Sequence, residues 1–358
     1  MRDDAVIQRK KFREISLADP FFDSLKKAYS EFVEWFERKG EEIAFVVYDE
    51  HSNLQGFMYL KEERGPVVDV VPPLNAPFVL KVGTFKVNAH GTRLGERFVK
   101  KIFDYAMARQ LLYVYVTVFP EYEVLVERLK TYGFTKHGYK ASANGREDVY
   151  VKEFARLVGD IRLDYPIINA IGTRKWLLSI RPEFHSRLFP DSLLKTEHAS
   201  LVEDLSHANS IHKVYISFAP GVADISRSDV LVMYRTAEEG KAAEYNSVAS
   251  SLCVVEEVRP WQSFADENAF VAYCRRHSVF AEGDLRKWYR RGGGVNVIRM
   301  TYNIALPKRP TRHVLAEDVG LDRAERWTLL QLTDSQFTKI LERGQVHEGA
   351  VVNQAGVR

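Results

Sequence analysis

The residue pattern with the clearest chemical meaning lies between positions 82 and 106. A β-rich stretch, Val82–Val87, leads into a short loop that contains Gly91, and a helical pattern follows. A loop of this kind presents backbone N–H groups without helix partners and the positive end of the helix dipole, which together bind phosphate oxygens. On residue types alone, an ordinary strand–loop–helix packing unit explains the pattern equally well.

The segment after the loop is predicted to be an amphipathic helix. Leu94, Phe98, Ile102 and Ala106 repeat at helical spacing, and charged residues lie between them. The spacing therefore indicates one buried face and one solvated face.

The order of the other predicted helices and short strands along the chain helps to choose between a phosphate-binding loop and an ordinary packing unit. In chain order they are a helix over 22–38, strands over 43–48 and 54–60, a strand over 111–118, a helix over 122–130 that ends at Gly133-Phe134, and strands over 135–140 and 148–153.

This succession resembles the acyl-CoA N-acyltransferases of the GNAT superfamily. Their motif, Gln/Arg-x-x-Gly-x-Gly/Ala, aligns with the residues from His90 to Gly95, so that His90 replaces Gln/Arg and Arg93 replaces the middle glycine. The resemblance implies that the loop amides bind the pyrophosphate of coenzyme A, that the preceding strand pairs with the pantetheine arm, and that acetyl-CoA or another acyl-CoA is the cofactor. The cofactor-binding residues carried over in this way are Phe85, Lys86, Val87, Gly91, Thr92, Arg93, Leu94, Gly95 and Glu96.

Acyl transfer to an amine also needs a proton donor for the thiolate that leaves. In the family, a tyrosine in the helix after the fifth strand often fills this role, but the aligned residue here is Leu129. Tyr132 or Tyr122 would have to act as the catalytic residue instead. A structural role is the alternative for each of these tyrosines.

The carboxylate that the family usually carries early in the strand before the loop is absent here, where the residue is Lys81. Glu62 and Glu63 end the preceding predicted strand and are conceivable bases. Exposed surface charge is the alternative explanation for both.

Composition is that of a globular protein, with 358 residues, 46% hydrophobic and 28% charged, enough for two domains. A formal net charge of +3 gives no global case for nucleic acid, so such an interface would have to be local. The first residues lack the apolar region of a signal peptide, and no run of about 18 apolar residues could span a bilayer. We therefore expect a cytoplasmic protein with no membrane partner.

Cysteine and histidine spacing gives no indication of a metal site. Cys253 and Cys274 are far apart in the sequence and fit small buried side chains in a reducing compartment. The histidines at 185, 198, 207 and 212 are unevenly spaced, and none has a His-x-x-x-His companion. We expect no metal ligand among them.

Past residue 174 a new alternation of strands begins. Strands are predicted over 176–180, 213–218, 229–234, 249–258 and 296–305, with helices chiefly over 265–277 and 334–343. Short strands with long excursions are typical of a small mixed or closed β-barrel with appended helices.

Three short motifs in this region resemble the PUA-like barrels of the ASCH and EVE kind. They are Leu178-Ser-Ile-Arg-Pro-Glu-Phe184, Ser228-Asp-Val-Leu-Val-Met-Tyr234 and Ser251-Leu-Cys-Val-Val-Glu-Glu-Val-Arg-Pro260. The resemblance implies a barrel that holds RNA or a modified base in a pocket on one face.

Between positions 286 and 291, two adjacent aromatic residues are flanked by two cations on each side. Cations neutralise phosphates and aromatic rings stack on unpaired bases, so the combination favours single-stranded RNA. In the alternative interpretation the aromatic pair packs into the barrel and the cations form a solvated face. The nucleic-acid-binding candidates are Arg286, Lys287, Trp288, Tyr289, Arg290 and Arg291.

The patterns predict an α+β chain. The two resemblances imply a GNAT-like mixed sheet carrying helices on both faces and a C-terminal PUA-like β-barrel with appended helices. The expected domains are 1–155 and 175–345, joined by a linker over 156–174 and followed by a flexible tail over 346–358. The predicted function is acetyl-CoA-dependent N-acetylation of an RNA-linked or nucleotide-linked substrate. The alternative is a catalytically inactive module in an RNA or modified-base sensor, and the acceptor and the oligomeric state stay open.

Overall fold

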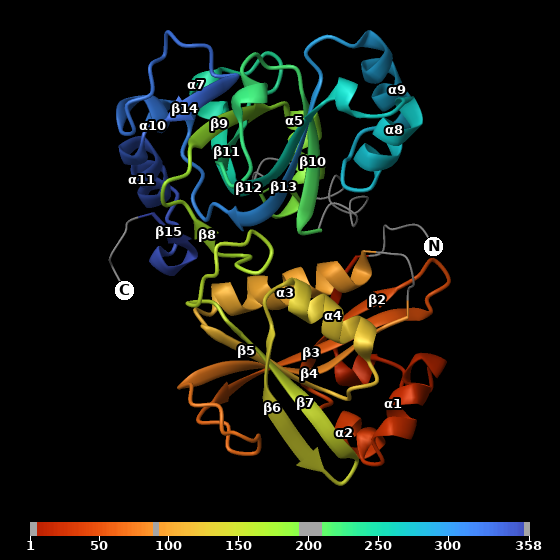
Figure 1. Cartoon of the computed structure of the whole chain (residues 1–358). Helices are drawn as coiled ribbons and strands as arrows, with labels where there is room; N and C mark the ends of the chain where they lie inside the picture. The colour runs from red at the N-terminus through yellow and green to blue at the C-terminus, as the bar shows by residue number, and fades with distance from the viewer. Residues whose placement is uncertain (1–5, 89–92, 193–209, 354–358) are drawn as a thin grey trace. The chain divides into compact units, whose positions relative to one another are not determined.

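The structure is a computed structural model that describes residues 6–88, 93–192 and 210–353. The chain divides into two compact units, Met1–Val158 and Gly159–Arg358, each built on its own main sheet (Figure 1). The predicted α+β class is confirmed, because each unit packs helices against a sheet. Within the described ranges, no helix combines the length and the apolar character that a bilayer crossing demands.

Seven strands form the sheet of the first unit, in the order β1-β2-β3-β4-β5-β7-β6. Every neighbouring pair is antiparallel except β4 and β5, which are parallel. Parallel neighbours need a crossover connection, which the helix between them supplies. In chain order the strands are β1 (Gln8–Lys11), β2 (Ile43–Tyr48), β3 (Leu54–Arg64), β4 (Phe78–Val87), β5 (Tyr113–Val118), β6 (Thr135–Ser142) and β7 (Gly145–Glu153).

Helices cover both faces of this sheet, as predicted (Figure 1). Helices α3 (Leu94–Ala108) and α4 (Glu123–Thr131) lie on one face. Helices α1 (Asp23–Ala28) and α2 (Phe32–Arg38) lie on the other. The single helix predicted over 22–38 is therefore wrong in one respect, because the chain leaves the helical conformation between α1 and α2.

The predicted apolar stripe of α3 is buried. Leu94, Phe98, Ile102 and Ala106 are each 2% exposed or less. The helix packs closely against β3 at Gly56, where an added Cβ atom would be 2.5 Å from Cε2 of Phe98. Glycine at this position thus sets how closely α3 approaches the sheet.

The main sheet of the second unit has the order β10-β13-β12-β11-β9-β14, in which only β9 and β11 are parallel. Its strands are β9 (Lys175–Ile180), β10 (His212–Ser217), β11 (Val230–Arg235), β12 (Val248–Pro260), β13 (Asn296–Ala305) and β14 (Leu329–Leu332). Its helices are α5 (Pro182–Leu188), α7 (Ala243–Asn246), α8 (Glu267–Arg275), α9 (Glu282–Arg291), α10 (Arg312–Glu317) and α11 (Asp334–Arg343).

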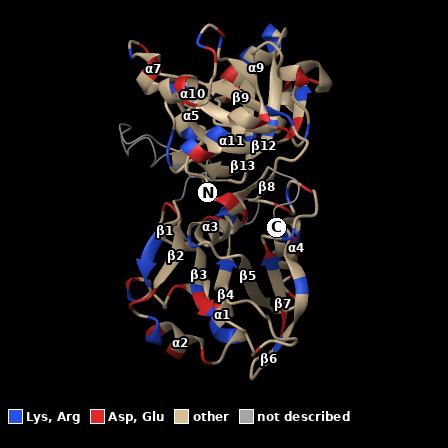
Figure 2. Ribbon diagram, turned by 90° about the vertical axis from the view of Figure 1, so that its left-hand side faces the viewer, with Lys and Arg blue, Asp and Glu red and all other residues tan. Residues whose placement is uncertain are grey.

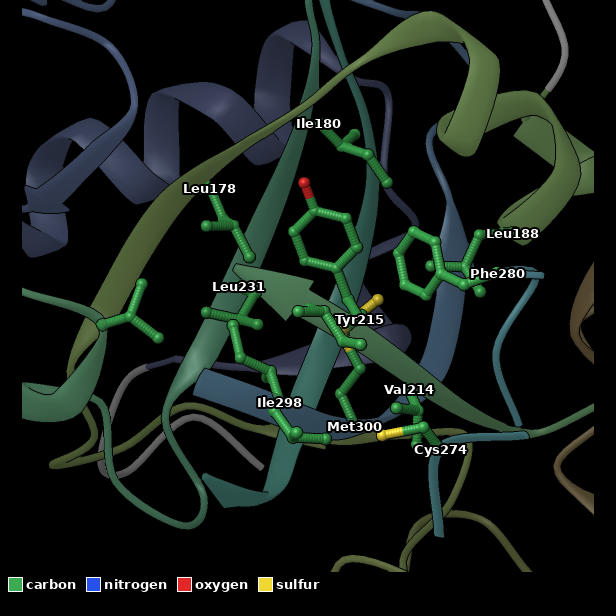
Figure 3. Packing of buried hydrophobic residues seen from close by; sticks show 14 of the residues in the cluster. Leu178, Ile180, Leu188, Val214, Tyr215, Leu231, Cys274, Phe280, Ile298 and Met300 are labelled. Carbon is green, nitrogen blue, oxygen red and sulfur yellow. The ribbon is translucent and has the colours of Figure 1, made fainter. Parts of the chain in front are cut away.

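Both faces of this second sheet are buried. Along β9 and β11, Leu178 and Leu231 belong to one hydrophobic core whereas Leu177 and Val230 belong to another, which is the two-residue period of a strand. The first core is completed by α5, α8 and α9, and the second by α10 and α11. Figure 3 shows Leu178, Leu231 and Ile298 converging in the first core. Burial on two faces explains why these strands are hydrophobic at nearly every position.

The segments expected to be a linker and a flexible tail are packed parts of the second unit. Strand β8 (Ile168–Asn169) pairs in parallel with β15 (Val351–Val352). Tyr165 is fully buried, and its hydroxyl donates a hydrogen bond to the backbone oxygen of Tyr302 at 2.9 Å. Apolar side chains at both ends of the unit drive this pairing, so those two expectations are wrong for residues 165–169 and 351–352. Residues 354–358 lie outside the described chain.

Candidate functional site

Strands β4 and β5 pair over only three residues and then diverge. Leu80–Val82 pairs with Val114–Val116, and on the side that faces β5 residues 83–87 pair with no strand of the described chain. An irregularity in the β3–β4 ladder at Gly83 accompanies the divergence, and such bulges increase the local twist of a strand. The β4 edge therefore offers main-chain groups to a bound molecule.

Gly83 is required at this irregularity. A Cβ atom there would lie 2.8 Å from Cδ1 of Tyr59 on the neighbouring strand. Real Cβ atoms do not approach carbon atoms so closely, so a larger residue would displace the ring of Tyr59 or the strand.

The predicted cofactor-binding residues of β4 point to alternate faces of the sheet. Phe85 turns toward α3, where its ring centre lies 5.6 Å from that of Phe98. Lys86 turns toward the opposite face, where its ammonium group donates hydrogen bonds to the backbone oxygen of Phe21 and to Oγ of Ser24. Burial lowers the pKa of Lys86. The backbone of this stretch is thus held in place from both sides.

Helix α3 begins directly after the loop, at Leu94. Arg93 is its N-cap residue, and the Arg93 side chain caps no amide of the first turn. The predicted residues Gly91 and Thr92 lie outside the described residues. Of the predicted loop residues from Gly91 to Glu96, the structure describes those from Arg93 onward.

Arg128 of α4 lies over the first turn of α3, and the sequence analysis missed it. A Cβ atom on Gly95 would be 3.1 Å from Nε and 3.3 Å from Cζ of Arg128, so the glycine leaves room for this guanidinium group. Two arginines therefore lie at the start of α3: Arg93 is its N-cap residue, and Arg128 packs beside Gly95 in its first turn. Arg128 is separated from the loop by 33 positions or more, and only the packing of α4 beside α3 brings it there.

The two tyrosines considered as catalytic residues lie at opposite ends of α4. Tyr122 is the N-cap residue and is 42% exposed, and its ring centre lies 6.5 Å from that of Phe119 after β5. Tyr132 is the C-cap residue and is buried. The structure does not bring the two together, and Leu129 between them is fully buried.

A pair formed by a half-buried tyrosine and a buried carboxylate lies on the α1 and α2 face. The hydroxyl of Tyr29 donates a hydrogen bond to Oε1 of Glu147 at 2.9 Å, and Glu147 is 6% exposed. Burial, followed by the Glu147 charge, raises the pKa of Tyr29. A second hydrogen bond, from Asn144 Nδ2 to a Glu31 carboxylate oxygen at 2.8 Å, joins the same two segments. The segment between α1 and α2 is thereby fastened to the β6–β7 hairpin.

Glu62 and Glu63, the conceivable bases, are both engaged. Glu62 accepts a hydrogen bond from the hydroxyl of Tyr105 at 2.9 Å. Glu63 accepts one from the hydroxyl of Tyr115 at 2.6 Å and pairs with Lys61 at 2.8 Å. Burial by itself would raise the pKa of Glu63, but these hydrogen bonds lower it.

In the second unit, the aromatic pair of α9 packs into the first core. The ring of Trp288 lies 4.9 Å from that of Phe280, and the ring of Tyr289 lies 5.5 Å from that of Trp261. Both side chains are half-buried. These contacts favour the packing alternative for Trp288 and Tyr289.

Two of the neighbouring arginines are held in ion pairs on the surface. Arg286 and Arg290 each contact Glu267 at 2.8 Å, and their hydrogen bonds lower the pKa of Glu267 to about 2. Lys287 and Arg291 are exposed. Lys287, Arg290 and Arg291 therefore all reach solvent.

We expect Trp288→Ala to lower the free energy of unfolding by about 2 kcal/mol, because a half-buried ring is removed from the core. Denaturant titration would measure the loss, and Tyr245→Ala, which removes an aromatic ring that is 66% exposed, should change stability far less. A tenfold loss of affinity for single-stranded RNA in folded Trp288→Ala would instead support the stacking interpretation.

Two of the histidines considered as metal ligands, His185 and His212, are buried. His185 is fully buried, which lowers its pKa to about 3, and His212 bonds through Nδ1 to Glu256 at 2.7 Å. His198 and His207 lie outside the described residues. Over residues 6–88, 93–192 and 210–353, no group of three or more His, Cys, Asp or Glu side chains is placed to hold a metal ion.

No family model and no curated protein matches this chain. Among solved structures, the chain is similar to Chaetomium thermophilum Naa20 in complex with a bisubstrate analogue, at 16% identity and a TM-score of 0.33 over 41% of this chain and 86% of that one. It is similar to an IAA acetyltransferase from Bacillus cereus, at 12% identity and a TM-score of 0.32 over 42% of this chain and 99% of that one.

The chain is also similar to ASCH from Zymomonas mobilis, at 12% identity and a TM-score of 0.33 over 47% of this chain and 94% of that one. The α+β fold class follows from the strand order and helix placement of the chain itself.

Proposed function

We propose that the first unit is an acyl-CoA-dependent N-acyltransferase, with acetyl-CoA as its cofactor, and that the second unit recruits an RNA-linked or nucleotide-linked amine. The observation that carries the acyltransferase proposal is the divergence of β4 from β5 after Val82 and Val116. It leaves a strand edge open beside a loop that leads into a helix N-terminus, which suits an extended arm that ends in a diphosphate.

The residues around the diverging strands fit coenzyme A. The backbone of Phe85–Val87 would pair with the amide-containing pantetheine arm. Arg93, Arg128 and the first-turn amides of α3 would hold the pyrophosphate, because guanidinium groups form strong charge-assisted hydrogen bonds with phosphate. Gly91 and Thr92 keep their place in this proposal from the sequence motif.

When bound, acetyl-CoA supplies an acyl thioester. Transfer forms a C–N bond to the acceptor amine and breaks the C–S bond, so one proton leaves the nitrogen and one is needed at the sulfur. Glu147 is our candidate for accepting the first proton, because its Oε2 has no hydrogen bond to another described residue. Tyr122, exposed after the diverging end of β5, is our candidate for donating the second. A backbone N–H of β4 would polarise the acyl carbonyl.

The second candidate function is a catalytically inactive first unit in an RNA or modified-base sensor. The fully buried Leu129 at the position of the family tyrosine, and the burial of Tyr132, favour it. The open β4 edge and the cations at α3 favour the enzyme.

Heating the full chain with acetyl-CoA separates these functions. At a hundred times its Kd, the cofactor should add about 2.7 kcal/mol to the free energy of unfolding and raise Tm by a few degrees. Adenosine and acetate, which lack the pantetheine arm, are the ligand controls. Mass spectrometry of RNA and protein fractions incubated with acetyl-CoA would identify the acetylated product. An unchanged Tm at millimolar acetyl-CoA, with no acetylated product, would favour the sensor.

A further inference from the structure

A half-buried lysine lies on β4 immediately before the strands diverge. Lys81 pairs with Lys61 of β3 and with Tyr115 of β5. Its ammonium group lies 5.5 Å from the centre of the Tyr115 ring and forms no hydrogen bond or ion pair with another described residue. Burial lowers the pKa of Lys81. The charges of Glu63 and Asp69 partly offset this effect, although neither carboxylate forms an ion pair with Lys81. A half-buried cation without a direct ion pair is stabilised when a ligand supplies an anion.

The carboxylates near Lys81 already have their own cations. Glu63 pairs with Lys61 at 2.8 Å, and Asp69 pairs with Lys140. Each carboxylate thus forms its direct ion pair with another lysine. Lys81 is a third cation, which acts on both carboxylates without an ion pair to either.

A hollow of about 400 Å³ opens beside this cluster. Its charged lining consists of the cations Lys61 and Arg64 and the carboxylates Glu62, Glu63 and Asp69. Directly paired residues point to the same face of a sheet, so Lys81 lies on the face of Lys61, which lines the hollow, although Lys81 itself is not one of the lining residues. Figure 2 shows the basic and acidic segments along β3 and β4.

The face of β4 that carries Lys81 continues to the point where β4 and β5 diverge. Thr84 and Lys86 pair with Tyr59 and Phe57, which are core residues beneath α1 and α2, so they lie on the face of Lys81. Lys81 precedes the irregularity at Gly83 by two residues. A molecule seated at Lys81 could therefore extend its other end to the open β4 edge.

We propose that Lys81 binds an anionic group, a phosphate or a carboxylate, that a small acceptor carries beside its amine. This inference rests on the proposed acyltransferase function for the role of the amine. The binding of the anion, however, can be measured without any turnover.

The test is titration of the full chain by NMR with four amines. Phosphoethanolamine and β-alanine carry an anionic group beside the amine, and ethanolamine and propylamine are the matched amines that lack it. We expect at least one anionic probe to bind about tenfold more tightly than the matched amine without the anionic group, and Lys81→Gln to remove the difference. The tighter of the two anionic probes identifies phosphate or carboxylate as the recognised group.

Lys101→Gln is the matched control, because Lys101 is also half-buried and lies 5.4 Å from the ring centre of Phe45 on the α3 side. It should keep the preference for anions, and the melting temperature of Lys81→Gln would show that the variant folds. The inference is overturned if the wild type shows no preference, or if the preference persists in Lys81→Gln. A Lys81-dependent preference without acetylation of any amine would overturn the proposed enzyme and leave this binding site standing.

Discussion

Arg128→Glu is expected to weaken acetyl-CoA binding about a hundredfold, which is about 2.7 kcal/mol of binding free energy. The guanidinium of Arg128 lies against Gly95 in the first turn of α3, where the diphosphate is proposed to bind. Removing a hydrogen bond to a charged group costs about 1.5–3 kcal/mol, and reversing the charge adds repulsion. Isothermal titration calorimetry at two salt concentrations would measure the loss, which should shrink as salt rises.

Lys130→Glu is the control for this experiment, because it makes the same charge change on the same helix. Lys130 is exposed and pairs with Glu127 at 2.7 Å. Its replacement should change the Kd less than twofold. Equal affinity in Arg128→Glu and the wild type would show that the diphosphate does not bind at the start of α3.

Glu256→Ala should lower the free energy of unfolding by about 3–5 kcal/mol, the usual cost of removing one partner from a buried ion pair. The Glu256 side chain is 4% exposed and contacts His212 Nδ1 at 2.7 Å, Arg162 Nε at 3.1 Å and Arg299 Nε at 3.0 Å. The substitution leaves these groups without their common anion. Denaturant unfolding at pH 7 would measure the loss.

The carboxylate of Glu256 also makes the free energy of unfolding depend on pH in the acid range. Burial by itself would raise the pKa of Glu256, but the His212 hydrogen bond and the arginine charges lower it from 4.5 to about 2. The unfolded chain therefore binds a proton before the folded chain does, so the contribution of Glu256 is present above about pH 4.5 and is lost as pH falls toward 2. Glu256→Ala should lack this part of the dependence.

Glu257→Ala is the neighbouring control, since the side chain of Glu257 is 45% exposed. It should cost less than about 1 kcal/mol, as exposed ion pairs do. Similar losses in the two variants would show that Glu256 is not the centre of a buried network.

Local periodicity was enough to predict the elements around the proposed site. The helix expected from Leu94 to Ala106 is α3, which continues to Ala108. The strand expected over 82–87 is the second half of β4. Both patterns depend on neighbours within one turn or one strand, which the sequence displays directly.

The break between α1 and α2 was not visible in the sequence, because the apolar spacing runs through it. Tyr29 and Glu31 make their hydrogen bonds in this break to Glu147 and Asn144, which are more than a hundred positions away. A partner at that distance is known only when the β6–β7 hairpin is placed beside α1 and α2.

By itself, the sequence determined the order of strand, loop and helix, the buried face of α3 and the α+β class. Only the tertiary structure decided that Arg128 covers Gly95, that Lys81 lies against the Tyr115 ring, and that Trp288 faces the core. The physical reason is the range of the interactions. Periodicity is a property of adjacent residues, whereas charge pairing and ring packing depend on strand register and helix packing between distant segments.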